Sequence, residues 1–346
     1  MDKNKLQKTV KQMLKPGKGL LAADESNKSC KKRFDDVDVE CTEELRRQYR
    51  QILISSPKIE NFLSGIIFYE ETFWQSTDNG ELFHEYVANR GIVPGIKLDQ
   101  GLIDLPGFAE EKISQGLDNL PDRIKPFAQV GAGFAKWRSV ITIGEKIPTN
   151  QCIEANAFVL ARYARICQDN NIVPIVEPEV FHEGKHNITT CQDVLIKTLD
   201  SLFSVLKYFR VYIPGVILKT SMVLPGKESG IVIDYNDVAN MTTSVLHKHA
   251  PKELGGIVFL SGGQSSKDAF INLNRIKQKP HPWPVTFSYS RAIQDPVLKT
   301  WAKNIDNKQK VEDVYINQLE LAKAATLGKL DESYDGDLFV SKSQDV

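Results

Sequence analysis

Lys219 closes the apolar run Gly215 to Leu218, at a point where a buried β-strand would emerge from a core. A lysine with an ordinary pKa near ~10.4 is almost fully protonated at pH 7 and is then a poor nucleophile. Neighbouring cations or an apolar pocket can lower the pKa of such an amine until it attacks a carbonyl carbon and forms a Schiff base. The alternative for a lysine at a strand end is a solvated cap, and the surrounding sequence decides between the two.

Charged and polar residues end most of the other short apolar runs as well. The residues at these ends are Asp24, Glu70, Lys97, Asp99, Lys136, Arg138, Glu177, Glu179, Ser261 and Arg291. A charge inside a buried strand is costly unless its side chain faces a wet opening. Their repeated position at run ends therefore predicts one enzyme site, where the carboxyl ends of parallel strands meet.

The spacing of these residues predicts which side chains share the opening. Residues two apart on a strand point to the same side, with Cα atoms about 6.6 Å apart. Lys136 and Arg138 should therefore both face the opening, as should Glu177 and Glu179. We expect Lys136 to approach Lys219 closely enough to disfavour the protonated form of the Lys219 amine.

Three carboxyl groups could transfer protons beside that amine. They belong to Asp24, Glu177 and Glu179, and we expect at least one of these acids to have a pKa raised toward neutrality. The alternative for Asp24 is a structural salt bridge with Lys136 across the barrel, and the alternative for the glutamates is ion pairing with Lys136 or Arg138. Both alternatives are compatible with catalysis.

Two short segments predict a phosphate site. Glycines in Ser261-Gly262-Gly263 let backbone N–H groups approach an anion, and the loops after strands seven and eight often bind phosphate in barrel enzymes. Arg291, in Ser290-Arg291, adds a forked charge-assisted contact. Candidates for a second phosphate site are Lys97, Arg138, Ser29 and Arg33. Two anion sites flanking an amine indicate a doubly phosphorylated carbonyl compound.

Eight β-branched and apolar runs must position these residues. They are 19–24, 65–70, 93–99, 134–141, 172–179, 215–219, 256–261 and 285–291. The stretches between them are mostly amphipathic, as 156–169 and 190–208 illustrate, and the alternation predicts an α/β fold with a parallel sheet. Eight such units over 346 residues fit a (β/α)8 TIM barrel. An open doubly wound sheet is the alternative, but no Gly-x-Gly-x-x-Gly follows the first run.

The whole chain, 1–346, is expected to form a single domain. The barrel would span about 19–330, preceded by an N-terminal arm of about 18 residues and followed by a flexible tail over 331–346. The 44 basic and 44 acidic residues cancel, so charge favours neither nucleic acid nor a membrane surface. Five scattered cysteines indicate reduced thiols, and neither a signal peptide nor a run of about 18 apolar residues occurs. These features predict a cytoplasmic protein.

Six stretches resemble class I fructose-bisphosphate aldolases. They read GKGLLAADES at 17–26, GIKLD at 95–99, FAKWR at 134–138, IVPIVEPE at 172–179, FLSGGQS at 259–265 and TFSYSRA at 286–292. The resemblance covers roughly residues 5 to 340 in the family's order. It implies a TIM barrel, usually a homotetramer, that acts in glycolysis and gluconeogenesis. The implied reaction of this lyase is the reversible cleavage of fructose 1,6-bisphosphate to dihydroxyacetone phosphate and glyceraldehyde 3-phosphate, without a metal or other cofactor.

The resemblance also implies roles for individual residues. Lys219 would form the imine with the C2 ketone, and Glu177 would serve as the general acid and base. The supporting charges would be Asp24, Lys136 and Glu179. The C1-phosphate site would hold Ser261, Gly262 and Arg291, and the C6-phosphate side would hold Lys97, Ser29 and Arg33.

The chain departs from the family pattern at four places. Pro214 replaces an acidic residue before the lysine, and Thr220 replaces the proline that usually follows it. Ser290 stands where glycine is common and adds a hydroxyl beside the expected phosphate. The family often ends in a tyrosine that reaches the site, whereas this chain ends in Val346 and Tyr334 is a poor positional match. We therefore expect proton exchange on the dihydroxyacetone phosphate enamine to be slower than in family members that have this tyrosine.

Other functions were weighed against this one. A metal-dependent lyase could use His182 with His186, whereas His247 and His249, two apart on a helix, would diverge. A glycoside hydrolase could use two glutamates, but it would have no use for a buried lysine or phosphate loops. A non-enzymatic scaffold is disfavoured by the complete set of residues, although additional protein partners stay possible. The preference between fructose 1,6-bisphosphate and fructose 1-phosphate also stays open.

Overall fold

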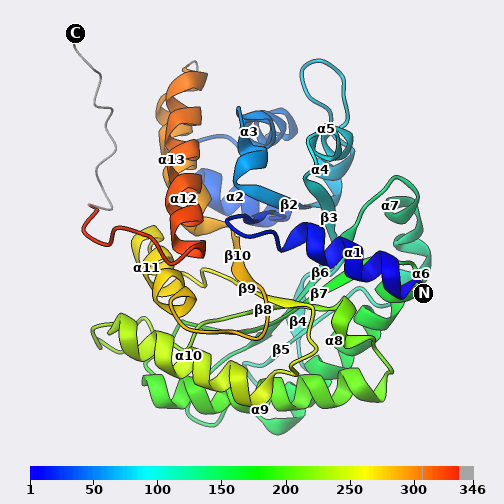
Figure 1. Ribbon diagram of the computed structural model, residues 1–346, viewed down its shortest axis with the longest axis vertical. Coiled ribbons are helices and arrows are strands. Elements are labelled where there is room, and N and C mark those ends of the chain that lie inside the picture. The colour runs from blue at the N-terminus through cyan, green and yellow to red at the C-terminus, as the bar shows by residue number, and fades with distance from the viewer. Residues whose placement is uncertain (306, 335–346) are drawn as a thin grey trace.

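Eight parallel strands close into a barrel in the computed structural model, which describes residues 1–305 and 307–334 (Figure 1). Around the barrel the strands follow the order β1, β10, β9, β8, β7, β6, β3 and β2. Their bounds are β1 Gly19–Ala23, β2 Leu63–Phe68, β3 Val93–Lys97, β6 Phe134–Ile141, β7 Val173–Val180, β8 Ile217–Thr220, β9 Gly256–Phe259 and β10 Val285–Tyr289. This confirms the predicted (β/α)8 TIM barrel. The boundaries lie within two residues of those predicted. Strands β1, β2, β9 and β10 end just before their polar residues, whereas β3, β6, β7 and β8 carry theirs at paired positions.

Helices follow each strand and surround the barrel. Their bounds are α2 Asn27–Asp35, α3 Glu43–Ser55, α4 Glu70–Trp74, α5 Phe83–Asn89, α6 Leu120–Arg123, α7 Lys125–Gln129, α8 Asn150–Asp169, α9 Ile188–Tyr208, α10 Tyr235–His249, α11 Ser266–Lys277, α12 Arg291–Lys303 and α13 Lys308–Thr326. A two-stranded antiparallel hairpin, β4 Leu102–Asp104 with β5 Lys112–Ser114, stands between β3 and α6. No helix in the described part of the chain is long and apolar enough to cross a membrane.

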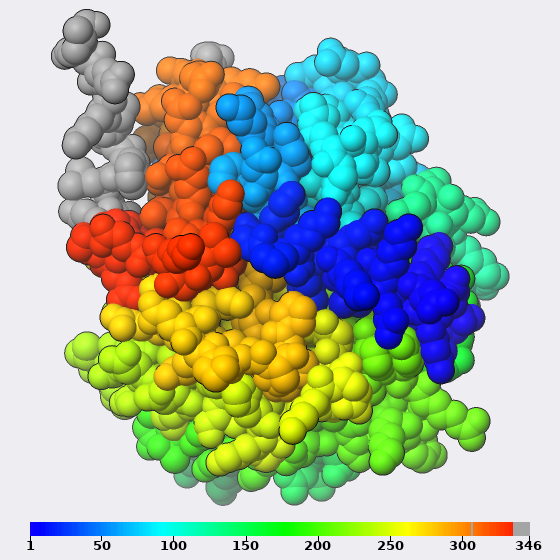
Figure 2. Space-filling view, viewed as in Figure 1, coloured from blue at the N-terminus to red at the C-terminus, as the bar shows by residue number. Residues whose placement is uncertain are grey.

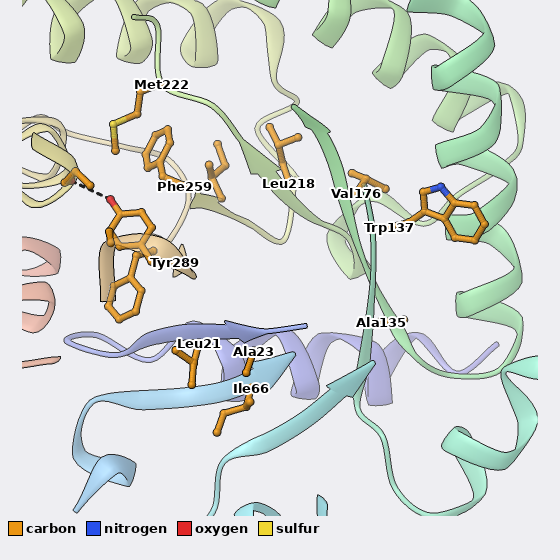
Figure 3. Packing of buried hydrophobic residues seen from close by; sticks show 14 of the residues in the cluster. Leu21, Ala23, Ile66, Ala135, Trp137, Val176, Leu218, Met222, Phe259 and Tyr289 are labelled. Carbon is orange, nitrogen blue, oxygen red and sulfur yellow. Dashed lines mark hydrogen bonds between the residues drawn. The ribbon is translucent and has the colours of Figure 1, made fainter. Parts of the chain in front are cut away.

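Alternation along the strands separates an outer core from the barrel interior. Trp137 and Tyr289 belong to the cluster of buried hydrophobic residues between strands and helices (Figure 3). Trp137 packs on Tyr163 of α8, with ring centroids 5.2 Å apart, and the Tyr289 hydroxyl donates to the carbonyl of Ala269. Because side chains alternate along a strand, the neighbours of Trp137 point into the barrel. This is how Lys136 reaches the interior.

The N-terminal arm covers one end of the barrel. It forms helix α1, Lys3–Met13, whose apolar residues Leu6, Val10 and Met13 are buried together with interior barrel residues such as Phe134. Figure 2 shows α1 lying across this face of the molecule. Burial of such side chains contributes about 1.5–3 kcal/mol each. The arm is therefore outside the sheet, as predicted, yet it forms part of the core.

The first residues of the predicted flexible tail are held against the barrel. Glu332 accepts a hydrogen bond from Asn274 at 2.7 Å and pairs with Arg275 at 2.6 Å, and both partners lie on α11. Tyr334 packs against the main hydrophobic core. The first residues of the predicted tail thus have partners on α11, and the flexibility of 331–346 stays a prediction. The rest of the predicted tail, 335–346, lies outside the described residues.

Candidate active site

A cavity of about 970 Å³ opens where the carboxyl ends of the barrel strands meet. Every predicted site residue lines it except Gly263. The lining residues predicted from sequence are Asp24, Ser29, Arg33, Lys97, Lys136, Arg138, Glu177, Glu179, Lys219, Ser261, Gly262, Ser290 and Arg291. The fold therefore brings together side chains that are as far as 267 positions apart, from Asp24 to Arg291, as expected for this end of a barrel.

Four buried charges form the centre of the cavity. Glu177 Oε1 lies 3.0 Å from Lys219 Nζ, and Glu177 Oε2 lies 2.9 Å from Lys136 Nζ. Lys136 Nζ also donates to Asp24 Oδ2 at 2.9 Å. The two amines thus contact opposite oxygens of one carboxylate. Glu177 therefore lies between the two amines, and the predicted effect of Lys136 on the Lys219 amine stays a prediction.

This arrangement fixes the charge of two of the four groups. Burial by itself would raise the pKa of Asp24, but the charges of Lys136 and Lys219 outweigh burial and hold that pKa well below its ordinary value. Burial would likewise lower the pKa of Lys136, but Asp24 and Glu177 raise it above its ordinary value. Asp24 is therefore a carboxylate and Lys136 an ammonium at pH 7. Asp24 is therefore not the acid with a raised pKa that was expected among the three, and the alternative of a salt bridge between Asp24 and Lys136 is present.

The neighbouring charges are paired as well. Glu179 forms an ion pair with the Nε of Arg138, and Lys97 pairs with Asp99 at 2.8 Å. In the ladder between β6 and β7, Arg138 lies opposite Glu177, so the polar residues of the two strands lie at the same height in the barrel. Glu179 is thus engaged by an arginine, whereas Glu177 contacts the two lysines. The two glutamates predicted to share the opening have different partners and are suited to different tasks.

The two departures beside Lys219 leave its strand intact. Pro214 lies in the short 3-10 turn η2, Ile213–Gly215, which precedes β8. Thr220 is the last residue of β8, where it pairs with Phe259 of β9. Lys219 therefore sits within a regular parallel ladder, which holds its side chain in the barrel.

The loop after β9 has the conformation expected of an anion site. Gly262 and Gly263 have φ angles of +53° and +84°, which residues with a side chain rarely adopt. The Arg291 guanidinium lies over this loop, 3.7 Å from where a Cβ on Gly263 would stand. Among residues 1–305 and 307–334, no carboxylate forms an ion pair with Arg291. An exposed guanidinium beside a glycine loop suits a phosphate group.

Other residues that were predicted to bind an anion are less free to do so. Arg33 forms ion pairs with Glu25 and with Asp295, the latter at 3.0 Å. The hydroxyl of Ser290 donates to Glu25 and does not project freely into the cavity. Ser29 lies in the first turn of α2, where the hydroxyl of Ser26 caps the helix. Arg33 and Ser290 therefore line the cavity with their polar groups already engaged.

Several lining residues were missed in the sequence. Lys28 and Lys32 lie on α2, one turn apart, and line the cavity beside Ser29 and Arg33. Lys28 and Lys32 are four residues apart, like Ser29 and Arg33, and this helical spacing could have indicated that they face the cavity too. Arg123 also lines the cavity and donates to the carbonyl of Leu98 at 3.0 Å, a contact that no local pattern indicates. Further missed lining residues are Glu25, Ser26, Tyr69 and Ser288.

The metal-binding alternative has no support in the side-chain arrangement of residues 1–305 and 307–334. Within residues 1–305 and 307–334, no three His, Cys, Asp or Glu side chains come together as a possible set of metal ligands. His182 and His186 both lie in the loop after β7, and burial lowers the pKa of each.

Comparison with known proteins gives the family. The family model described as glycolytic, fructose-bisphosphate aldolase class-I, matches residues 5–344. The chain belongs to the class I fructose-bisphosphate aldolase family. It is 44% identical to a probable fructose-bisphosphate aldolase class 1 of Xanthomonas campestris pv. campestris, over 95% of this chain and 99% of the relative. It is 43% identical to fructose-bisphosphate aldolase C-B of Danio rerio, over 94% of this chain and 91% of the relative.

A solved aldolase structure agrees with the fold. It is fructose-bisphosphate aldolase from Plasmodium falciparum, crystallised in complex with TRAP and a small-molecule inhibitor. The two chains are 43% identical, share a TM-score of 0.92, and the match covers 94% of this chain and 95% of the other. The protein is thus a lyase that cleaves fructose bisphosphate by an aldol reaction in glycolysis, and membership of class I implies a Schiff-base mechanism.

Proposed function

We propose that Lys219 forms the Schiff base and that Glu177 moves the protons in this aldolase. The observation that carries the proposal is the contact of Glu177 with the Lys219 amine at 3.0 Å, inside a cavity with basic residues at both ends. A group that transfers protons must lie within hydrogen-bond reach of the reacting atom, and Glu177 meets that condition for the amine nitrogen.

The first half of the reaction builds the imine. Lys219 Nζ attacks the C2 carbonyl of the ketose, and the carbinolamine forms with a proton placed on the former carbonyl oxygen. Glu177 protonates the leaving hydroxyl, water departs, and a protonated imine remains. The fixed ammonium of Lys136 and carboxylate of Asp24 keep the central charge balanced while Glu177 changes its protonation state.

The second half breaks the carbon–carbon bond. Glu177 takes the proton of the C4 hydroxyl, the C3–C4 electron pair moves into the protonated imine, and glyceraldehyde 3-phosphate leaves. The enamine on Lys219 is then protonated at C3, and water releases dihydroxyacetone phosphate. Glu179 would hold Arg138, and the loop of Ser261, Gly262 and Gly263 with Arg291 would bind the C1 phosphate.

The opposite end of the cavity is proposed to bind the second phosphate. Lys97, Ser29 and Arg33 were predicted there, with Arg138 as a further contact, and all four line the cavity. Lys28 and Lys32, which form no ion pair within residues 1–305 and 307–334, supply further positive charge on the same helix as Ser29. The family likeness further supports a homotetramer, which light scattering of the purified protein would test. It also supports a cytoplasmic location.

Substitution of the lysine tests the proposal. Lys219→Arg keeps a positive charge but removes the nucleophilic amine, so cleavage of fructose 1,6-bisphosphate should fall to background. Lys31→Arg is the matched control, because Lys31 is exposed and pairs with Asp35 on the surface. An undiminished rate in the Lys219→Arg variant would refute the assignment.

A further inference from the structure

Glu25 is a mostly buried carboxylate that the proposed mechanism does not use. It follows Asp24 directly, and its side chain lies between two arginines. Arg50 Nη2 contacts Glu25 Oε2 at 2.6 Å, and Arg33 Nη1 contacts Glu25 Oε1. Arg50 is only 2% exposed, which is rare for an arginine and is permitted here by the pairing. Burial would raise the pKa of Glu25, but Arg50 and Arg33 outweigh it, so the carboxyl is ionised.

The same carboxylate reaches across to the turn after β10. The Ser290 hydroxyl donates to Glu25 Oε1, and Gln294 Nε2 donates to that oxygen at 3.2 Å. Gln294 is fully buried and also donates to the carbonyl of Ala22, at the end of β1, at 2.6 Å. The turn after β1 and the turn after β10 are therefore joined by contacts that converge on Glu25.

These two turns carry residues for opposite ends of the substrate. The turn after β1 leads into Ser29 on α2, on the proposed C6-phosphate side. The turn after β10 leads from Ser290 into Arg291, which lies over the glycine loop of the proposed C1-phosphate site. Any shift of one turn relative to the other changes the separation between the two phosphate sites.

We propose that Ser290 and Glu25 are positioning residues that hold the two phosphate sites at the separation that a ketose bisphosphate needs. This inference rests on the proposed function and deepens it. A bisphosphate binds both ends at once, so its affinity depends on their separation, as for any linked pair of binding groups. Fructose 1-phosphate binds at one end only and does not sense that separation. The hydroxyl at position 290, where the family commonly has glycine, thus becomes a determinant of substrate preference.

Removal of the Ser290 hydroxyl tests the proposal. The kinetic constants of Ser290→Ala and Ser290→Gly are measured with fructose 1,6-bisphosphate and with fructose 1-phosphate. A hydrogen bond to a charged acceptor corresponds to about tenfold in affinity, so the KM for the bisphosphate should rise by about that factor. The kcat for both substrates and the KM for fructose 1-phosphate should change by less than about twofold.

Two further variants make the test specific. Thr300→Val removes a hydroxyl on the same helix, α12, that donates to the carbonyl of Pro296, and it should leave both KM values unchanged. Glu25→Gln should raise the KM for the bisphosphate, and adding Ser290→Ala to it should cause little further change. Such non-additivity is expected of two residues that act through one contact.

The outcomes separate this proposal from the proposed function. Borohydride should trap dihydroxyacetone phosphate on Lys219 in Ser290→Ala as efficiently as in the unaltered protein. If trapping is normal but both substrates lose affinity equally, or neither does, the positioning role is refuted while the Schiff base stands. If the unaltered protein itself forms no adduct, the proposed function fails.

Discussion

Replacement of Lys136 by methionine should remove the cation that neutralises two buried carboxylates. Lys136 Nζ lies 2.9 Å from both Asp24 Oδ2 and Glu177 Oε2, and the three side chains are 5%, 10% and 4% exposed. Removal of one partner from a buried ion pair costs about 3–5 kcal/mol, because the remaining charge has lost its solvent and its partner. Methionine fills most of the volume of the lysine stem, so the loss of the charge, and not a cavity, should account for most of the lost stability.

Lys31→Met is the matched control for this substitution. Lys31 pairs with Asp35 at 2.8 Å, but the two side chains are 67% and 55% exposed. A solvated pair of this kind contributes about 0–1 kcal/mol. The free energy of unfolding, measured by urea denaturation at pH 7, should therefore fall several times further in Lys136→Met than in Lys31→Met.

The stability difference between the unaltered protein and Lys136→Met should depend on pH. In the unaltered protein the pKa of Asp24 lies below the unfolded value of 3.8, so its pairing stabilises the fold above that pH and the stabilisation is lost as the pH falls through the folded pKa. In Lys136→Met the main opposing charge is gone and burial raises the pKa of Asp24. The stability difference between the two proteins should be largest near neutral pH and should shrink toward about pH 4. Equal stability of the two methionine variants at pH 7, or a difference that does not change with pH, would refute the reasoning.

Three further results are expected. Glu177→Gln should lower kcat by about 10²–10⁴-fold, the usual contribution of a proton-transfer group, and an unchanged kcat would contradict its role. Arg291→Ala should raise the KM for fructose 1,6-bisphosphate by about tenfold or more, because it removes a charge-assisted contact, whereas Arg291→Lys should recover part of the loss. His84 is buried and stacks on Phe73 with centroids 4.5 Å apart, and burial lowers its pKa below 6.5. The unfolded chain therefore binds the proton more readily, and stability should fall as the pH drops below about 6.5. His84→Phe should flatten that fall in urea denaturation, and an unchanged slope would argue against it.

The sequence was sufficient to predict the barrel and the four charged residues at the centre of its cavity. Strand-length apolar runs are local signals, and a closed parallel sheet brings all their carboxyl ends to one side. Lys136 and Glu177 could be placed in the cavity because alternation along a strand is a strict rule. Ion pairing of the glutamates with Lys136 or Arg138 was one of the alternatives, but the spacing could not decide which glutamate pairs with which cation.

Contacts between distant side chains account for most of what was missed. Leu6, Val10 and Met13 show helical spacing, but the surface that they cover is assembled from several strands and exists only in the closed barrel. The partners of Glu25 likewise come from different elements, with Ser290 being 265 positions away. No local pattern reports a contact at that range, so the engagement of the Ser290 hydroxyl emerged only from the structure.

Borohydride reduction in the presence of dihydroxyacetone phosphate tests the central claim most directly. Reduction converts an imine into a stable secondary amine, which peptide mass spectrometry can assign to one residue. One adduct per chain is expected, on the peptide that contains Lys219, and none in the Lys219→Arg variant. An adduct on another lysine with Lys219 unmodified, or full cleavage activity without any adduct, would contradict the account.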